Sequence, residues 1–98
     1  MTSVSRSLVL CEFVVDMADR RGPHRDAHLA YLGGLHADGV LEAAGPLGDP
    51  VSGSALVFAV DPARADALVR EDPYVRAGLV TGWTVEPWSV VVGGPGAG

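Results

Sequence analysis

The sequence predicts one small α+β domain whose strands and helices follow the order β-α-β-β-α-β. Four runs rich in Val, Leu and Phe are typical of strands, and two stretches that begin with proline have the apolar spacing of helices. This order is that of the split, ferredoxin-like arrangement, in which one antiparallel four-stranded sheet carries both helices on one face. A chain of 98 residues has room for one such domain.

The four predicted strands cover residues 7–15, 40–47, 54–60 and 80–92. The turn-rich residues 48–53 join the second strand to the third, which predicts a hairpin. Pro87 has no N–H to donate, so we expect its part of the last strand at an edge or a bulge. The first and last strands are apolar on both faces. We therefore expect a partner subunit in a homodimer to cover the face without helices with a second sheet.

Residues 22–39 predict the first helix. Gly22 suits the N-cap, Pro23 the first helical position and Gly39 a left-handed C-terminal cap. Spacings of three and four define one inward face, which holds Ala27, His28, Tyr31, Leu32 and Leu35. The mid-helix pair Gly33-Gly34 costs roughly 1 kcal/mol per residue against alanine. This pair indicates either close helix–sheet packing or room for a ligand.

Asp61 is expected to cap the second helix, with Pro62 at the first helical position. The helix is interrupted at Asp72-Pro73, because proline disfavours the helical conformation of the residue before it. Residues 74–79 are expected as a short helical turn or loop, and residues 16–21 as a polar link before the first helix. The domain is expected to span residues 1–92, followed by a flexible glycine-rich tail over residues 93–98.

Composition narrows the class of protein. Hydrophobic residues make up 48% of the chain and charged residues 19%, which is typical of a folded domain. The net charge of −5 argues against a nucleic-acid partner. The apolar runs are too short to span a membrane, and the N-terminal residues lack a signal-peptide pattern, so we expect a cytoplasmic protein. Cys11 is the single cysteine and is expected to be a buried, unreactive thiol.

A set of short motifs resembles the YCII family. In chain order they are Arg25-Asp-Ala-His28-Leu, Gly39, Ala44-Gly45-Pro46, Glu71-Asp72-Pro73-Tyr74-Val75-Arg76-Ala77-Gly78-Leu79 and Trp83-Thr-Val-Glu-Pro87-Trp88. The resemblance covers residues 7–92. It implies a ferredoxin-like fold that dimerises into an α/β barrel, and a site that pairs His28 with Asp72. Family members with an assigned activity take part in aromatic-ring breakdown, in particular dehydrochlorination.

The chemistry of such a pair is compatible with that implication. An aspartate that accepts a hydrogen bond from one imidazole nitrogen fixes the tautomer and leaves the other nitrogen to exchange a proton. Elimination, isomerisation and tautomerisation need this exchange and no metal or other cofactor. We therefore expect a cofactor-independent lyase or isomerase acting on a small cyclic or aromatic molecule. The expected catalytic residues are His28 and Asp72, and the expected substrate-binding residues are Arg25, Tyr74 and Trp83.

The same residues allow a second interpretation. The hydrogen bond between His28 and Asp72 can be purely structural, tying the first helix to the Asp-Pro turn. Arg25 can then be a solvated side chain, and the aromatic residues can serve core or interface packing. The chain would in that case be a non-catalytic module of the same fold that binds a small organic ligand or takes part in an assembly.

A metal site is the weaker interpretation of the histidines. His24 lies four residues before His28, a spacing that can chelate a metal on one helical face. A third ligand is not evident, since Glu12 and His36 are only candidates and His36 lies eight residues beyond His28. We therefore predict no metal, and expect both His24 and His36 at the surface.

Overall fold

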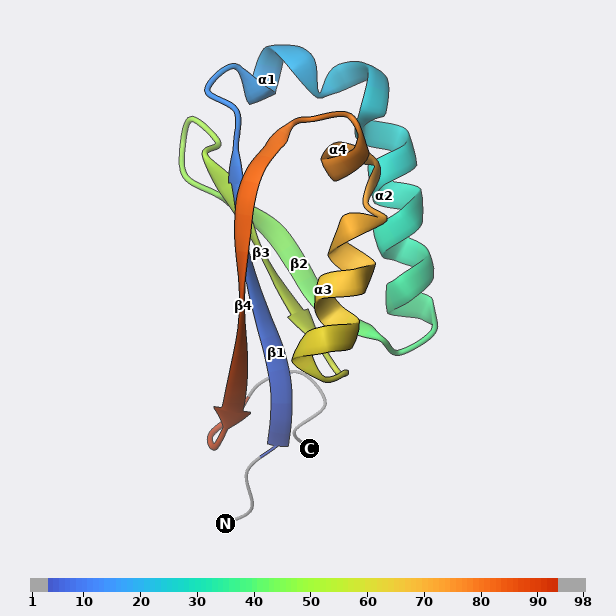
Figure 1. The fold of residues 1–98 in the computed structure, drawn as a ribbon, viewed down its shortest axis with the longest axis vertical. Coiled ribbons are helices and arrows are strands. Elements are labelled where there is room, and N and C mark those ends of the chain that lie inside the picture. Colours follow the sequence, from blue (N-terminus) through green and yellow to red (C-terminus); the bar gives the residue numbers. More distant parts are fainter. Residues whose placement is uncertain (1–3, 94–98) are drawn as a thin grey trace.

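The computed structural model describes residues 4–93 as an antiparallel sheet with its helices gathered on one face (Figure 1). The elements in chain order are β1 (Val4–Phe13), α1 (Met17–Arg20), α2 (Gly22–Ala37), β2 (Leu41–Leu47), β3 (Gly53–Phe58), α3 (Pro62–Arg70), α4 (Pro73–Arg76) and β4 (Val80–Val90). The four strands lie in the order β2-β3-β1-β4. The α+β, ferredoxin-like architecture predicted from the sequence is therefore confirmed.

Side chains of the central strand β1 point alternately to the face that the helices cover and to the opposite face. Ser7, Val9 and Cys11 are buried beneath the helices, whereas Leu8 and Leu10 point to the opposite face. The hydroxyl of Ser7 donates to the carbonyl oxygen of Val60 at 2.7 Å, which satisfies this buried polar group. The predicted burial of Cys11 is confirmed, and burial raises the pKa of its thiol.

Two apolar clusters hold the helices on the sheet. The larger one lies under α2 and α3 and is built from Val9, Cys11, Leu41, Leu56, Phe58, Ala65 and Val69. The smaller one joins α1, α4 and the start of β4 through Met17, Tyr74 and Leu79. Phe13, at the end of β1, packs against both clusters. The second cluster therefore fixes the short helices at one end of the sheet, where the pocket described below is found.

The structure corrects three local predictions. The predicted polar link contains the helical turn α1, because Met17 is fully buried and anchors it. Arg21, and not Gly22, is the N-cap of α2. Ala27 is exposed and does not share the inward face, since the helix turns the neighbouring side chains at 28, 31, 32 and 35 toward the sheet. The predicted caps at Gly39 (φ 76°) and at Asp61, which accepts from the Arg64 amide, are confirmed.

The glycine pair in α2 does not mark close packing. A Cβ atom built on Gly33 or Gly34 meets no other atom within 4 Å. Of the two explanations left open by the sequence, close approach of helix and sheet is thereby excluded. These positions face open space.

No element of residues 4–93 covers the sheet face opposite the helices (Figure 1). Leu10, Leu47 and Trp88 are exposed there or at its margins. Arg6 and Glu42 form an ion pair whose side chains are largely buried. The predicted homodimer, which would cover this face, stays a prediction.

Among residues 4–93, no helix is long and apolar enough to cross a membrane. Most of the predicted tail, from residue 94 onward, lies outside the described residues.

Candidate functional site

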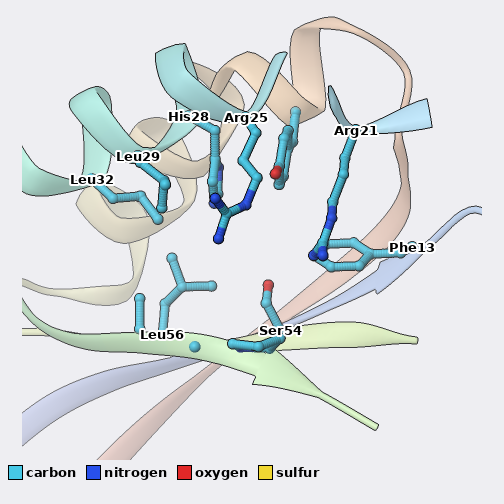
Figure 2. Close-up of a pocket in the computed structure, with 12 residues that line it drawn as sticks. Phe13, Arg21, Arg25, His28, Leu29, Leu32, Ser54 and Leu56 are labelled. Atoms are coloured by element: carbon cyan, nitrogen blue, oxygen red, sulfur yellow. The ribbon is translucent and has the colours of Figure 1, made fainter. Parts of the chain in front are cut away.

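A pocket of about 140 Å³ lies between the first half of α2 and the sheet. Figure 2 shows α2 above the pocket, carrying Arg25, His28, Leu29 and Leu32, with Arg21 just before the helix, and the sheet below it, carrying Ser54 and Leu56. The remaining lining residues are Phe13, Ala44, Gly45, Pro46 and Tyr74. The lining is mostly apolar, with its polar groups gathered at the end near the start of α2. Such a mixture is typical of small-molecule sites.

The predicted histidine–aspartate pair is present at this pocket. Nδ1 of His28 lies 2.8 Å from Oδ1 of Asp72, and both side chains are largely buried. The same carboxylate oxygen accepts a hydrogen bond from the amide of Tyr74 at 2.9 Å. A carboxylate accepts but does not donate, so the imidazole carries its proton on Nδ1 in this hydrogen bond. Nε2 has no hydrogen-bond partner within residues 4–93 and can meet a ligand.

The Asp-Pro turn explains how Asp72 comes to face α2. Pro73 restricts Asp72 to an extended conformation, observed at φ −61° and ψ 129°. In that conformation Asp72 is the N-cap of α4, and its side chain caps the amide of Tyr74. The cap holds the carboxylate in place while the same oxygen contacts His28. One short motif therefore ends α3, starts α4 and orients the imidazole.

Tyr74 holds the imidazole from a second direction. The two rings are stacked, with centroids 3.7 Å apart and planes 7° from parallel. Phe13 in turn packs its ring against Tyr74 edge to face at 6.1 Å. Burial raises the pKa of Tyr74, an effect opposed by the charges of Arg21 and Arg25 and reinforced by Asp72. The phenol is therefore neutral at physiological pH.

Four of the five predicted site residues come together. His28, Arg25 and Tyr74 line the pocket, and Asp72 lies directly behind His28. Trp83 lies elsewhere: its indole N–H donates to Asp66 at 2.9 Å, and the Arg70 guanidinium lies 5.3 Å from the centre of its ring. The structure therefore gives Trp83 contacts with α3 and none with this pocket.

Arg21 is a pocket residue that the sequence pattern did not predict. The sequence places it in the polar link, yet its side chain lines the pocket beside that of Arg25. A sequence signal existed, because the two arginines are four residues apart and share a helical face once the helix is extended backward.

The other histidines are separate from the site: His36 donates from Nδ1 to the Leu41 carbonyl oxygen at 2.8 Å. Among the described residues, no group of three or more candidate ligands is placed to hold a metal.

Fold and pocket together define a class: a ferredoxin-like domain with an aspartate-bound histidine in a cleft between its long helix and its sheet. Residues 6–89 match the YCII-related domain, and the chain belongs to this family. A similar solved structure is 5-chloro-2-hydroxyhydroquinone dehydrochlorinase (TftG) of Burkholderia phenoliruptrix in complex with 2,5-dihydroxybenzoquinone. The two chains are 27% identical, with a TM-score of 0.71 over 85% of this chain and 92% of the other. Comparison with curated proteins finds no match.

Proposed function

We propose that this chain is a cofactor-independent enzyme, of the lyase or isomerase type, that moves a proton on a small cyclic or aromatic molecule. One observation carries the proposal: a buried aspartate holds the imidazole on Nδ1, and Nε2, which lies beside a pocket, has no hydrogen-bond partner among residues 4–93. The similarity to a dehydrochlorinase whose solved structure is a complex with a quinone supports a catalytic role and a ligand with a single six-membered ring.

The pair suits general acid–base catalysis. Neutral His28 takes a proton from a substrate carbon or hydroxyl through the Nε2 lone pair, and the carboxylate of Asp72 stabilises the imidazolium that forms. The electron pair left on the substrate forms a double bond. In an elimination it expels a leaving group as its anion, and in an isomerisation the ring is protonated again at another atom. A positioned imidazole contributes about 10²–10⁴-fold to such rates.

The size of the pocket agrees with a single ring. Its volume of about 140 Å³ is close to that of engineered cavities of about 150 Å³ that admit benzene. Leu29, Leu32 and Leu56 provide apolar contact for the faces of a ring. Arg25 and the neutral hydroxyl of Tyr74 are placed to donate hydrogen bonds to substrate oxygens.

The first experiment combines ligand stabilisation with turnover. A panel of phenols, quinones and other single-ring compounds is screened for an increase in melting temperature, and each hit is then followed by chromatography for consumption. We expect at least one compound that stabilises the protein to be consumed. Stabilisation by several compounds with no consumption of any would identify a binding module and contradict the proposal.

His28→Gln is expected to reduce turnover by about 10²-fold or more, because glutamine cannot exchange the proton. His24→Gln is the matched control, since His24 lies on the same helix and does not line the pocket. Asp72→Asn is expected to reduce turnover about tenfold or more and to change the tautomer of His28, which ¹⁵N NMR of the imidazole reports. Equal turnover by the His28 and His24 variants, with both folded by circular dichroism, would exclude His28 as the base.

A further inference from the structure

The arginines of this chain fall into two groups. Four of the seven form ion pairs with carboxylates: Arg6 with Glu42, Arg20 with Asp16, Arg70 with Asp66 and Arg76 with Glu71. Arg21, Arg25 and Arg64 have no carboxylate within 4.0 Å in residues 4–93. Acidic residues outnumber arginines by twelve to seven, so partners are plentiful. Two of the three unpaired arginines nevertheless line the same pocket.

Local structure brings these two side chains together. Arg21 is the N-cap of α2 but has helical angles (φ −71°, ψ −23°), so Arg21 and Arg25 project one turn apart from the same face. Figure 2 shows both side chains directed toward the sheet, that of Arg25 from the helix and that of Arg21 from the residue before it. Arg21 is held in place because its amide donates to the Met17 carbonyl oxygen at 2.9 Å, and Met17 is fully buried. The junction of α1 and α2 therefore fixes the backbone positions from which the two arginine side chains reach the pocket.

Nothing in the pocket wall neutralises them. Among the residues that the structure describes, the lining contains two arginines and no aspartate or glutamate. The nearby carboxylate of Asp72 is already bound by His28 and by the amide of Tyr74. Both arginines and Tyr74 line the pocket, and the two positive charges lower the pKa of Tyr74 against the effect of its burial. Two unopposed cations beside an apolar surface attract an anion.

We propose that Arg21 and Arg25 form a clamp for a carboxylate on the substrate ring, so that this chain acts on a small aromatic or cyclic carboxylic acid. A carboxylate fits because guanidinium binds its two oxygens with two parallel hydrogen bonds, whereas a phenolate offers one oxygen. With the carboxylate at the clamp, the ring lies over the leucines and its reacting edge faces Nε2 of His28. The identity of the substrate rests on the proposed function, but the clamp is tested by binding alone.

The test compares benzoate with benzamide, which has nearly the same shape and no charge. Binding is followed by ¹H–¹⁵N NMR titration of the full chain, without turnover. We expect the wild-type protein to bind benzoate about tenfold or more tightly than benzamide, because a charge-assisted hydrogen bond contributes more than a neutral one. Arg21→Gln and Arg25→Gln are each expected to weaken benzoate about tenfold and to leave benzamide within about twofold.

Arg64→Gln is the matched control, because Arg64 is also unpaired but does not line the pocket. It should leave both affinities within about twofold of the wild type. Arg25→Lys, which keeps the charge but loses the planar fork, should retain part of the preference. Melting temperatures verify that each variant is folded.

Three results would overturn the clamp. They are equal affinity for benzoate and benzamide, variants of Arg21 and Arg25 that behave like Arg64→Gln, and binding of 4-nitrophenolate as tight and as arginine-dependent as that of benzoate. Failure of the clamp can be distinguished from failure of the proposed function. If neutral phenols or quinones are consumed but benzoate shows no preference, the clamp fails and the function stands. If benzoate binds through both arginines but no ring compound is consumed, the function fails and the clamp stands.

Discussion

His28 is held more firmly than a hydrogen bond alone would hold it. Asp72 fixes one ring nitrogen, and Tyr74 covers one face of the ring at stacking distance. Phe13 then limits the movement of Tyr74. An acid–base group is efficient when its geometry is set before the substrate arrives, so the aromatic support is as much part of the site as the aspartate.

The two tyrosines of the chain provide a titration that tests this arrangement. Burial raises the pKa of both Tyr31 and Tyr74 above the ordinary value of 10.0. In an unfolded chain both phenols ionise near that ordinary value, whereas the folded chain keeps them protonated. The raised pKa values therefore link folding to pH. The contribution of the two phenols to the free energy of unfolding is fully present below about pH 10, and it is lost as the pH rises through the folded-state pKa values.

We expect tyrosinate absorbance near 295 nm to appear at higher pH in the native protein than in denaturant, and the free energy of unfolding to fall above about pH 10. Tyr74→Phe should leave a single titrating phenol, that of Tyr31, still shifted upward. Superimposable titration curves in the native and denatured states would show that neither phenol is buried as described.

At the scale of elements, the short helices determine the site. The four-residue turn α1 carries Arg21 to the pocket, and the four-residue turn α4 carries Asp72 and Tyr74. Both turns are too short to be stable alone. They persist because Met17, Tyr74 and Leu79 form a common buried cluster with the end of β1. Substitutions in that cluster are therefore expected to affect ligand binding as well as stability.

The glycines of α2 offer a test of local energetics. Gly33→Ala is expected to raise the free energy of unfolding by about 1 kcal/mol, because alanine favours the helix and its Cβ meets nothing within 4 Å. Gly53→Ala, the contrasting variant, should lower it by about 1–3 kcal/mol, since a Cβ there collides with the Cys11 carbonyl oxygen. Urea denaturation measures both. A loss of stability in Gly33→Ala would mean that another surface packs against α2.

Sequence patterns predicted the long elements better than the short ones. The strands, the Asp61 cap and the Asp-Pro turn follow from residue types whose effects are local, so they could be predicted. The turn α1 could not, because its stability depends on the burial of Met17 in a cluster assembled from distant segments. The position of Trp83 depends on which face of β4 meets α3, and alternation alone does not assign the faces.

The same reasoning applies to the candidate site. The pairing of His28 with Asp72 was predicted from a resemblance, and the observed contact spans 44 residues of sequence. No periodicity connects positions that far apart. The position of Arg21 could not be predicted because α2 begins one residue earlier than the Gly22-Pro23 pattern indicates, and no capping side chain marks this boundary.

At the scale of the whole molecule, the part of the sheet that the structure describes has helices on one face and no covering element on the other. The uncovered face of β1 presents Leu8 and Leu10, which lie beside Val57 and Ala55 of β3. In an antiparallel sheet with one face in water, the residues that point to that face are normally polar. Leu8 and Leu10 occupy two successive outward positions of β1 and depart from that pattern. The site lies on the other face, so covering this one leaves the pocket accessible.

We therefore predict a homodimer in which this face meets the same face of a second copy. Sedimentation equilibrium should give twice the mass of the chain at micromolar concentration. Leu10→Glu should produce a folded monomer, because a carboxylate at the centre of the interface would be buried without a partner. Val15→Glu is the control: Val15 is fully exposed and lies beyond the end of β1, so this variant should remain dimeric. A wild-type protein that sediments as a monomer, or a dimer that the Leu10 substitution leaves intact, would contradict the prediction.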